Sequence, residues 1–345
     1  MRITILLGGA SAERDVSLAS GLRIAEALRA RGHGVVLVDP ASGVIAPDEE
    51  GEMRARGVLH PAPPSLDALR GLAHAALLPA LGTLAEVREA EVVFLALHGG
   101  EGEDGTIQAV LDLARVPYTG SGHLGSALAM DKDLSKLLMR AAEVPTPDWL
   151  MAGGRHGAAP DAAAVTKRLG LPVVVKPSKQ GSTVGLTVVK DAAALPAAVA
   201  EAAVYDDEVM LERFVPGREL TVAILGGEAL PVGEIIPKHE IYDYECKYTA
   251  GMAREEFPAR LSSKVAAEAQ RSAQRAFDAL KLDGYARIDF RMNEREELFC
   301  LEANTLPGMT ELSLVPQAAA AAGIDFGALC ERIVALALAA SRGGA

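Results

Sequence analysis

The chain has 345 residues, enough for two or three domains, and its 34 basic and 46 acidic residues give a formal net charge of −12. An apolar fraction of 50% with 23% charged residues is typical of globular proteins and excludes a disordered or fibrous chain. The absence of a basic block argues against nucleic-acid binding, and no apolar run reaches the roughly 18 residues needed to cross a bilayer.

The first third of the chain alternates between strand and helix patterns. Apolar runs at 3–7, 35–39 and 92–97 predict buried strands, and the pattern at 16–30 predicts a helix. The first run is too short for a signal peptide and no cleavage site follows it. Such alternation is typical of an open parallel sheet covered by helices on both faces. The segment 41–64, rich in Pro, Gly and acidic residues, is interpreted as a surface excursion.

The remainder of the chain predicts mixed strands and helices. Strands are expected at 173–176, 186–189, 209–212, 286–290 and 298–303, and helices at 124–142, after Asp191 and at 265–280. The domain boundaries are placed near residues 120 and 215, giving domains 1–120, 121–215 and 216–345. Three cysteines, an odd number without CxxC spacing, predict neither a disulfide framework nor a zinc site and fit a reducing cytoplasm.

The two last predicted strands carry polar residues at alternate positions. Arg287 and Asp289 share one face of the first strand, and Glu302 and Asn304 share one face of the second. If the strands pair, three oxygen ligands suited to Mg²⁺ and one guanidinium suited to phosphoryl charge meet on one surface. A solvated sheet face with ordinary ion pairs is the alternative.

Two lysines stand beside features that suit phosphate binding. Lys176 ends a buried strand and precedes the Gly/Ser-rich loop 177–185, whose backbone N–H groups could face phosphate oxygens. The loop is not a Walker A motif, because GxxxxGK[ST] is absent from the sequence. An ordinary surface turn remains an alternative, and Lys132, on a predicted helix, could simply be solvated.

Two further candidates end strands of the predicted parallel sheet, at the edge where open α/β folds bind ligands. Glu13 lies in the glycine turn 8–17, where it could bind a substrate ammonium or merely compensate a helix dipole. His98 follows the strand 92–97, where it could face a ligand or act as a capping or core histidine.

Two other segments need an interpretation. The sequence GSGHLG at 120–125 satisfies G-x-G-x-x-G, but the strand before it is short and polar, so a turn and helix start are predicted instead of a dinucleotide site. The stretch 239–248 is dense in ionisable and aromatic groups and lacks periodicity, which indicates either a lid or an exposed loop.

Taken together and in this order, these segments resemble the D-alanine:D-alanine ligase family of the ATP-grasp superfamily. The resemblance runs from Leu7 to the helix after Phe326. It rests on seven motifs: GGASAERDVSLASG, ALHGGEGEDGT, MDK, VVVKPSKQGSTVG, YDYECKY, ARIDF and LEANTLPGMTELSLVP.

The resemblance implies an α/β, three-domain ATP-grasp fold: an N-terminal open parallel α/β domain, then two α+β domains that sandwich the nucleotide. For ATP it implies contacts from Lys132, Lys176, Glu212, Phe214, Val215, Glu219 and Lys247. For the amino acids it implies Glu13, Ser182, Tyr248, His98, Ser313 and Leu314, with Arg287 and the Gly308 amide at the oxyanion. For the metal it implies Asp289, Glu302 and Asn304.

The family chemistry phosphorylates the carboxylate of one D-alanine with ATP and lets the amine of a second attack the acyl phosphate, for peptidoglycan precursors. Implied cofactors are two Mg²⁺ (or Mn²⁺) ions, with an activating K⁺ left open, and a cytoplasmic homodimer is expected. Tyr248 favours an amine nucleophile, because relatives that make D-alanyl-D-lactate lack it. Alternatives are a D-lactate or D-serine ligase, an ATP-grasp ligase for a larger carboxylate, and a non-catalytic nucleotide or amino-acid sensor.

Overall fold

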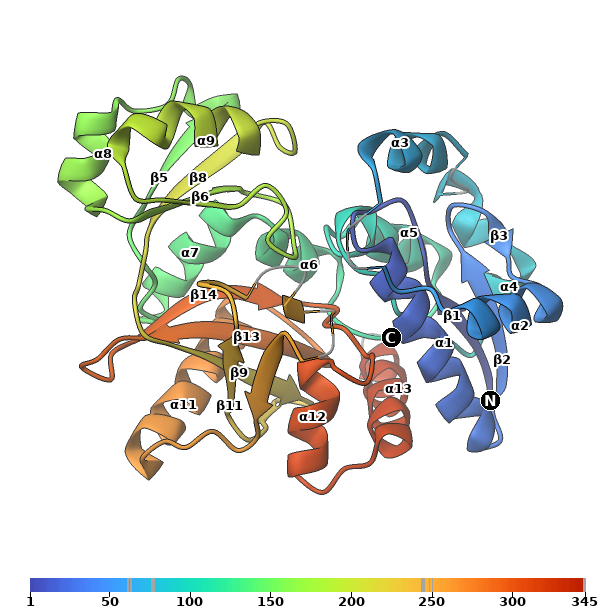
Figure 1. Cartoon of the computed structure of the whole chain (residues 1–345). Coiled ribbons are helices and arrows are strands. Elements are labelled where there is room, and N and C mark those ends of the chain that lie inside the picture. Colours follow the sequence, from blue (N-terminus) through green and yellow to red (C-terminus); the bar gives the residue numbers. More distant parts are fainter. Residues whose placement is uncertain are drawn as a thin grey trace.

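The chain folds around three β-sheets that Figure 1 shows as three distinct parts. The computed structural model describes residues 1–60, 62, 64–75, 78–242, 246–247, 249 and 251–343. In this part of the chain, no helix combines the length and the apolar character that a bilayer crossing requires. The architecture is the α/β fold expected from the sequence.

The N-terminal sheet has the strand order β3-β2-β1-β4. Its strands are β1 (Arg2–Leu6), β2 (Gly34–Asp39), β3 (Gly43–Val44) and β4 (Val92–Leu95). Strands β2, β1 and β4 are parallel, which confirms the predicted parallel sheet, and the short β3 is antiparallel to β2. Its helices are α1 (Arg14–Ala30), α2 (Pro47–Arg56), α3 (Leu66–Ala75), α4 (Ala85–Arg88) and α5 (Thr106–Ala114), with short 3₁₀ turns at Leu78–Thr83 and Gly100–Gly102.

The described part of the segment 41–64, which the sequence predicts to be a surface excursion, contains β3 and α2, and most of α2 is exposed. Met53 of α2 is buried in the N-terminal core. Glu50 lies 2.6 Å from Arg29 of α1 and 2.9 Å from Arg54. The acidic residues of this segment thus include one that joins α2 to α1.

The single helix predicted at 124–142 is wrong, since the structure has α6 (His123–Met130) and α7 (Lys132–Ala141) there. Asp131 between them has an extended backbone, and its carboxylate accepts the Leu134 N–H at 3.0 Å. This is an N-cap, which starts a new helix. Lys132 therefore occupies the first position of α7. The predicted turn and helix start at 120–125 is confirmed by α6.

The central sheet is antiparallel, with the order β5-β8-β6-β7. Its strands are β5 (Trp149–Gly153), β6 (Val173–Pro177), β7 (Thr187–Val189) and β8 (Glu208–Arg213). Helices α8 (Ala162–Leu169) and α9 (Leu195–Ala202) pack on it, with 3₁₀ turns at Gly154–His156 and Ala192–Ala194. Figure 1 shows α8 and α9 on the upper side, so the other side faces the C-terminal sheet.

The C-terminal sheet is antiparallel, with the order β12-β11-β9-β13-β14 and β10 paired to β9. Its strands are β9 (Arg218–Leu225), β10 (Glu228–Ala229), β11 (Gly233–Pro237), β12 (Ala253–Glu256), β13 (Tyr285–Met292) and β14 (Leu298–Asn304). Helix α11 (Ser263–Ala279) covers it (Figure 1). The apolar stripe predicted on this helix is confirmed, because Val265, Ala269, Ala273, Ala276 and Leu280 are all buried.

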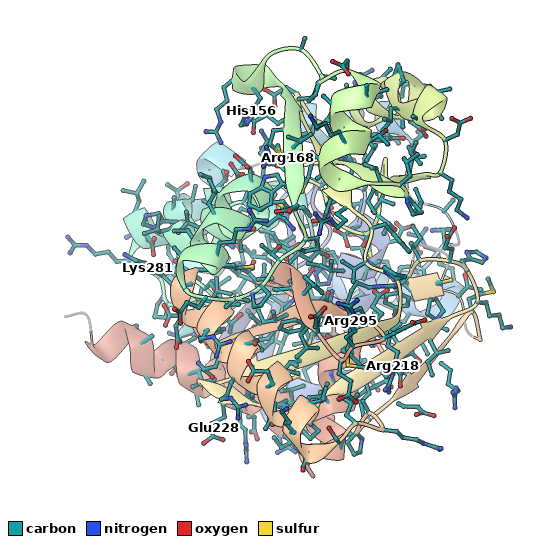
Figure 2. All side chains as sticks on the ribbon, turned by 90° about the vertical axis from the view of Figure 1, so that its left-hand side faces the viewer. His156, Arg168, Arg218, Glu228, Lys281 and Arg295 are labelled. Atoms are coloured by element: carbon teal, nitrogen blue, oxygen red, sulfur yellow. The ribbon has the colours of Figure 1, made fainter. Side chains whose placement is uncertain are left out.

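The C-terminal end of the chain returns to the N-terminal part. Helices α12 (Leu314–Ala321) and α13 (Phe326–Gly343) follow the last strand, and α13 packs against α1 and β4 (Figure 1). Leu306 and Met309, just after β14, belong to the same core cluster as the N-terminal strands. Figure 2 shows the charged side chains of Arg168 on the upper part and Arg218 on the lower part. The proposed division at 120 and 215 stays a prediction.

Candidate active site

An open cavity with a free volume of about 900 Å³ lies between the central and C-terminal sheets. Lys176 of β6 and Glu212 of β8 line it from the central sheet. Asp289 of β13 and Glu302 of β14 line it from the C-terminal sheet. The walls of the cavity therefore carry charged side chains from both sheets.

The opening between the sheets is lined partly by apolar side chains. They include Val174, Leu186, Phe214, Val215, Ile241 and Leu301. Arg291 lies 5.5 Å from the Phe214 ring centroid and donates to the Val215 carbonyl at 3.0 Å. Glu219 accepts from Arg291 at 3.2 Å, and burial raises the pKa of Glu219 despite that neighbour. An apolar slot with a carboxylate at its border suits a planar base and its sugar.

Another part of the cavity collects positive charge. Lys132 lies 3.4 Å from Glu302, and Lys247 lies 5.5 Å from the Tyr242 ring centroid. Burial alone would raise the pKa of Glu302, but surrounding cations outweigh burial and lower that pKa to about 2. The cations are Lys132, Lys247, Lys176 and Arg287. Such a cluster suits the negative charge of a polyphosphate.

Glu212 is buried between two lysines. Its Oε1 accepts from Lys176 at 3.0 Å and its Oε2 accepts from Lys136 at 2.5 Å. Burial would raise the pKa of Glu212, but the charges of Lys136 and Lys176 reverse the effect and lower it. Both carboxylate oxygens are therefore engaged by side chains of this chain.

The predicted pairing of the two polar strands is confirmed. Strands β13 and β14 are antiparallel, with Arg287 opposite Asn304 and Asp289 opposite Glu302. Asp289 accepts from Arg287 at 2.9 to 3.2 Å and from Asn304 at 3.0 Å. Thr221 of β9 donates to Asp289 at 2.7 Å. These contacts hold the acidic and amide side chains on one face of the sheet.

This donor set fits a hard divalent cation. Within the described residues, no three His, Cys, Asp or Glu side chains gather to hold a metal by themselves. Asp289 and Glu302 supply two carboxylates, and Asn304, whose Nδ2 donates to Asp289, turns an amide toward the same place. Mg²⁺ typically takes one or two carboxylates and completes its shell with water and phosphate oxygens, so two carboxylates and an amide suffice.

A second pocket adjoins the first. Its described lining includes Glu13, His98, Ser182, Arg287, Asn304, Gly308, Ser313 and Leu314. The Ser182 hydroxyl donates to Glu13. A Cβ at Gly181 would stand 2.5 Å from the Glu13 Oε2 atom, so a side chain at position 181 would push the Glu13 carboxylate from its present position. The loop between β6 and β7 thus packs onto the carboxylate of the N-terminal turn, and Ser182, Tyr242 and Lys247 line both pockets.

Leu306, just after β14, is held by two buried side chains of the N-terminal part. The Leu306 N–H donates to Glu103 at 3.0 Å, and its carbonyl contacts His98 Nδ1 at 2.7 Å. Glu103 also accepts the Gly99 N–H at 2.7 Å. Burial, reinforced by the Glu13 charge, raises the pKa of Glu103 to about 7. Burial lowers the pKa of His98, which favours a neutral ring that donates through Nδ1.

The next residues of this turn are held in the same way. Ser20 of α1 accepts the Met309 N–H at 3.1 Å and contacts His98 Nε2 at 3.1 Å. Arg23 donates to the carbonyls of Met309 and Thr310 at 3.0 and 2.7 Å. Gly308, between these anchors, is thereby fixed relative to the N-terminal sheet.

The structure brings the predicted site residues together in these two pockets. The first is lined by Lys132, Lys176, Glu212, Phe214, Val215, Glu219, Lys247, Asp289 and Glu302. The second is lined by Glu13, His98, Ser182, Arg287, Asn304, Gly308, Ser313 and Leu314. Tyr248 lies outside the described residues. The role of each residue stays a prediction.

Sequence reasoning missed Glu103, Lys136 and Ser20. Glu103 lies in the acidic loop after His98, where it resembles a solvated charge, and its partner Leu306 is 203 positions away. Lys136 stands four positions after Lys132 on α7, the spacing of one helical face, which was an available signal. Ser20 lies within a predicted helix, and no local sequence pattern distinguishes it from other helix residues.

Comparison with known proteins agrees with this geometry. Residues 2–121 match the family model described as D-ala D-ala ligase N-terminus, and residues 138–335 match D-ala D-ala ligase C-terminus. A D-alanine–D-alanine ligase of Syntrophobacter fumaroxidans is 42% identical over 343 residues, covering 98% of each chain. One of Citrifermentans bemidjiense is 43% identical over 333 residues, covering 96% of this chain and 95% of the relative.

Solved structures give the same result. The ligase of Bacillus anthracis complexed with ATP has a TM-score of 0.75 and 28% identity, covering 99% of both chains. The ligase of Coxiella burnetii has a TM-score of 0.77 and 27% identity, covering 99% of this chain and 96% of the other. With family models matching most of its length, the chain belongs to the D-alanine–D-alanine ligase family.

Proposed function

We propose that this protein joins two D-alanine molecules into D-alanyl-D-alanine with ATP as the energy source, forming ADP and phosphate for peptidoglycan precursor synthesis. The observation that carries the proposal is the contact between the two pockets, which share Ser182, Tyr242 and Lys247. A nucleotide in the cavity between the sheets would direct its phosphates toward an amino acid in the second pocket. Family membership supports the same reaction.

The nucleotide would lie along the first cavity. The base would occupy the apolar slot beside Phe214 and Val215, with Glu212 at its border and Glu219 toward the ribose. The phosphates would meet Lys132 and Lys176, and Lys247 would reach the terminal phosphate. Asp289, Glu302 and Asn304 would hold Mg²⁺ or Mn²⁺, which would screen the phosphate charge during transfer.

The amino acids would occupy the second pocket. Glu13 would bind the ammonium of the first D-alanine, and Ser182 and Tyr248 would orient it. Arg287 and the Gly308 amide would hold the oxyanion, with His98 beside the first D-alanine. Ser313 precedes the first residue of α12, so its hydroxyl and the Leu314 amide would bind the second carboxylate at a helix N-terminus.

The chemistry follows from this placement. A carboxylate is a poor acyl donor, so one carboxylate oxygen of the first D-alanine attacks the γ-phosphorus and ADP leaves. The neutral amine of the second D-alanine then attacks the acyl carbon, loses a proton, and expels inorganic phosphate. The lysines and Arg287 line the two pockets and, once the substrates are bound, would stabilise the charge of both steps. A homodimer of three-domain subunits remains part of the proposal.

The proposed reaction is tested with one product analysis. Purified protein is incubated with Mg-ATP and equal concentrations of D-alanine, D-lactate and D-serine at neutral pH, and products are separated by mass. We expect ADP and D-alanyl-D-alanine in equal amounts as the main products. If a depsipeptide or D-alanyl-D-serine were the main product, the assignment of D-alanine as the acceptor would be wrong. Nucleotide binding without ADP release would contradict the ligase and favour a sensor.

A further inference from the structure

Lys136 is a fully buried lysine behind the nucleotide cavity. Its side chain has an exposed fraction of 0%, and its Nζ contacts Glu212 Oε2 at 2.5 Å and Thr146 Oγ1 at 2.6 Å. The Trp149 ring centroid lies 5.2 Å from the same nitrogen. The described lining of the cavity includes Lys176 and Glu212 but not Lys136. Among the residues that the structure describes, Glu212 is the one that joins Lys136 to the lining of the cavity.

Lys176, Glu212 and Lys136 form a row of three charged side chains at the side of the cavity that the central sheet lines. Lys176 and Lys136 bind opposite oxygens of Glu212, so the row carries two positive charges and one negative charge. A buried carboxylate is costly unless it is paired, and removing its last partner is strongly destabilising. Glu212 alone would need only one lysine. The pair of lysines therefore carries one positive charge more than Glu212 needs. The exposure of each lysine decides which of them can release Glu212.

Of these two lysines, Lys176 is the one that can release Glu212 and turn into the cavity. Its side chain is 9% exposed and borders the cavity, while Lys136 is enclosed by Thr146, Trp149 and Glu212. A polyphosphate in the cavity would compete with Glu212 for Lys176. Without Lys136, the transfer of Lys176 to phosphate would strand a buried carboxylate.

We propose that Lys136 is a positioning residue that keeps Glu212 compensated, so that Lys176 is free to turn from this carboxylate to the phosphates of the nucleotide. The inference rests on the proposed nucleotide site. It predicts that loss of the Lys136 charge weakens ATP binding and leaves D-alanine binding nearly unchanged, because Glu13, which would bind the D-alanine ammonium, lines the second pocket and is not among the described residues that line the nucleotide cavity.

The first experiment measures nucleotide affinity directly. Calorimetric titration of a non-hydrolysable ATP analogue with Mg²⁺ compares wild type, Lys136→Met and Lys136→Arg. We expect Lys136→Met to weaken binding about tenfold or more, and Lys136→Arg, which keeps the charge, to restore most of it. Arg140→Met is the matched control, because Arg140 packs on the same Trp149 ring at 4.3 Å and does not contact Glu212. Equal affinity of wild type and Lys136→Met would overturn the proposal.

The second experiment is a double-mutant cycle. If Lys136 acts through Glu212, then Lys136→Met adds little loss of affinity to Glu212→Gln, because no buried carboxylate remains to be stranded. Fully additive losses in the double variant would overturn the proposal, since Lys136 would then act by another route. Thermal unfolding of each variant shows which proteins are folded at the temperature of the titration.

A pH series compares wild type with Lys136→Arg and tests the proposal independently of Lys136→Met. Burial lowers the pKa of Lys136 to about 8, and the groups acting on it are Glu212, Lys176 and Cys300. Below this pKa Lys136 is charged, so the affinity for the analogue should be full there and decline as pH rises through about 8. The Lys136→Arg variant should lack that decline, because its guanidinium stays charged. An identical decline in both proteins would overturn the proposal.

The failure of this inference is distinguishable from failure of the proposed function. Both the titration and the pH series measure nucleotide binding, and neither needs turnover. A protein that binds the analogue but makes no dipeptide would refute the ligase assignment and leave the role of Lys136 testable. A competent ligase with no difference between Lys136→Met and wild type would refute only the inference.

Discussion

A Lys176→Met variant should lose about 10²–10³-fold in kcat/KM for ATP-dependent dipeptide formation while remaining folded. Lys176 lies one residue before the end of β6 and borders the nucleotide cavity. Methionine is about as long as lysine but carries no charge. The substitution therefore removes the interaction with phosphate at little cost in packing. The fold should persist because Glu212 keeps Lys136 as its partner.

The measurement is a coupled assay for ADP release over a range of ATP concentrations, with thermal unfolding to confirm the fold. Lys167→Met is the control, since Lys167 lies on α8 over the same sheet and outside the cavity lining. The control should retain wild-type kinetics. A Lys176→Met variant with wild-type kcat/KM would contradict the proposal that Lys176 binds the phosphates of ATP.

The second large effect is expected for Glu103→Gln, which should lower kcat about ten- to a hundredfold. Each Glu103 oxygen accepts one backbone N–H, from Gly99 and Leu306. Glutamine has one carbonyl oxygen, and its NH₂ group would face one of these donors. The turn that carries Gly308 would then lose an anchor, and the oxyanion amide would shift from its place.

Its test separates kcat from KM for D-alanine and ATP. A turn displaced from the oxyanion should lower kcat and leave the KM for ATP within about twofold, because Glu103 lines the second pocket and is not among the described residues that line the nucleotide cavity. Glu101→Gln removes the same charge from the same loop and should behave as wild type, because Glu101 is exposed. Equal losses in both variants would indicate a general charge effect, and the anchoring role of Glu103 would be wrong.

The parts of the fold that follow local periodicity were predictable from sequence. The strands β1, β2 and β4 and the buried stripe of α11 appeared where the apolar pattern placed them. The break at Asp131 was missed because helix-forming residues flank it on both sides, and only its capping carboxylate ends the pattern. Strand β9 was missed too, since it pairs with β13 far along the chain, and β11 was missed together with its partner β9.

The site divides in the same way. Alternation along β13 and β14 was enough to place Arg287, Asp289, Glu302 and Asn304 on one face, because the side-chain period of a strand is two. Helical spacing from Lys132 was a signal for Lys136, but neither the contact of Lys136 with Glu212 nor that of Glu103 with Leu306 could be predicted, because tertiary folding brings these partners together. A charge in a polar loop or on a helix resembles a solvated one until its burial is known.

The central claim is that ATP lies between the two sheets, with its phosphates facing the paired tips of β13 and β14. A crystal structure with an ATP analogue, Mg²⁺ and D-alanine tests it most directly. We expect the base beside Phe214, the phosphates at Lys132 and Lys176, and the cation at Asp289 and Glu302. A nucleotide bound elsewhere, or a cation away from both carboxylates, would contradict the account.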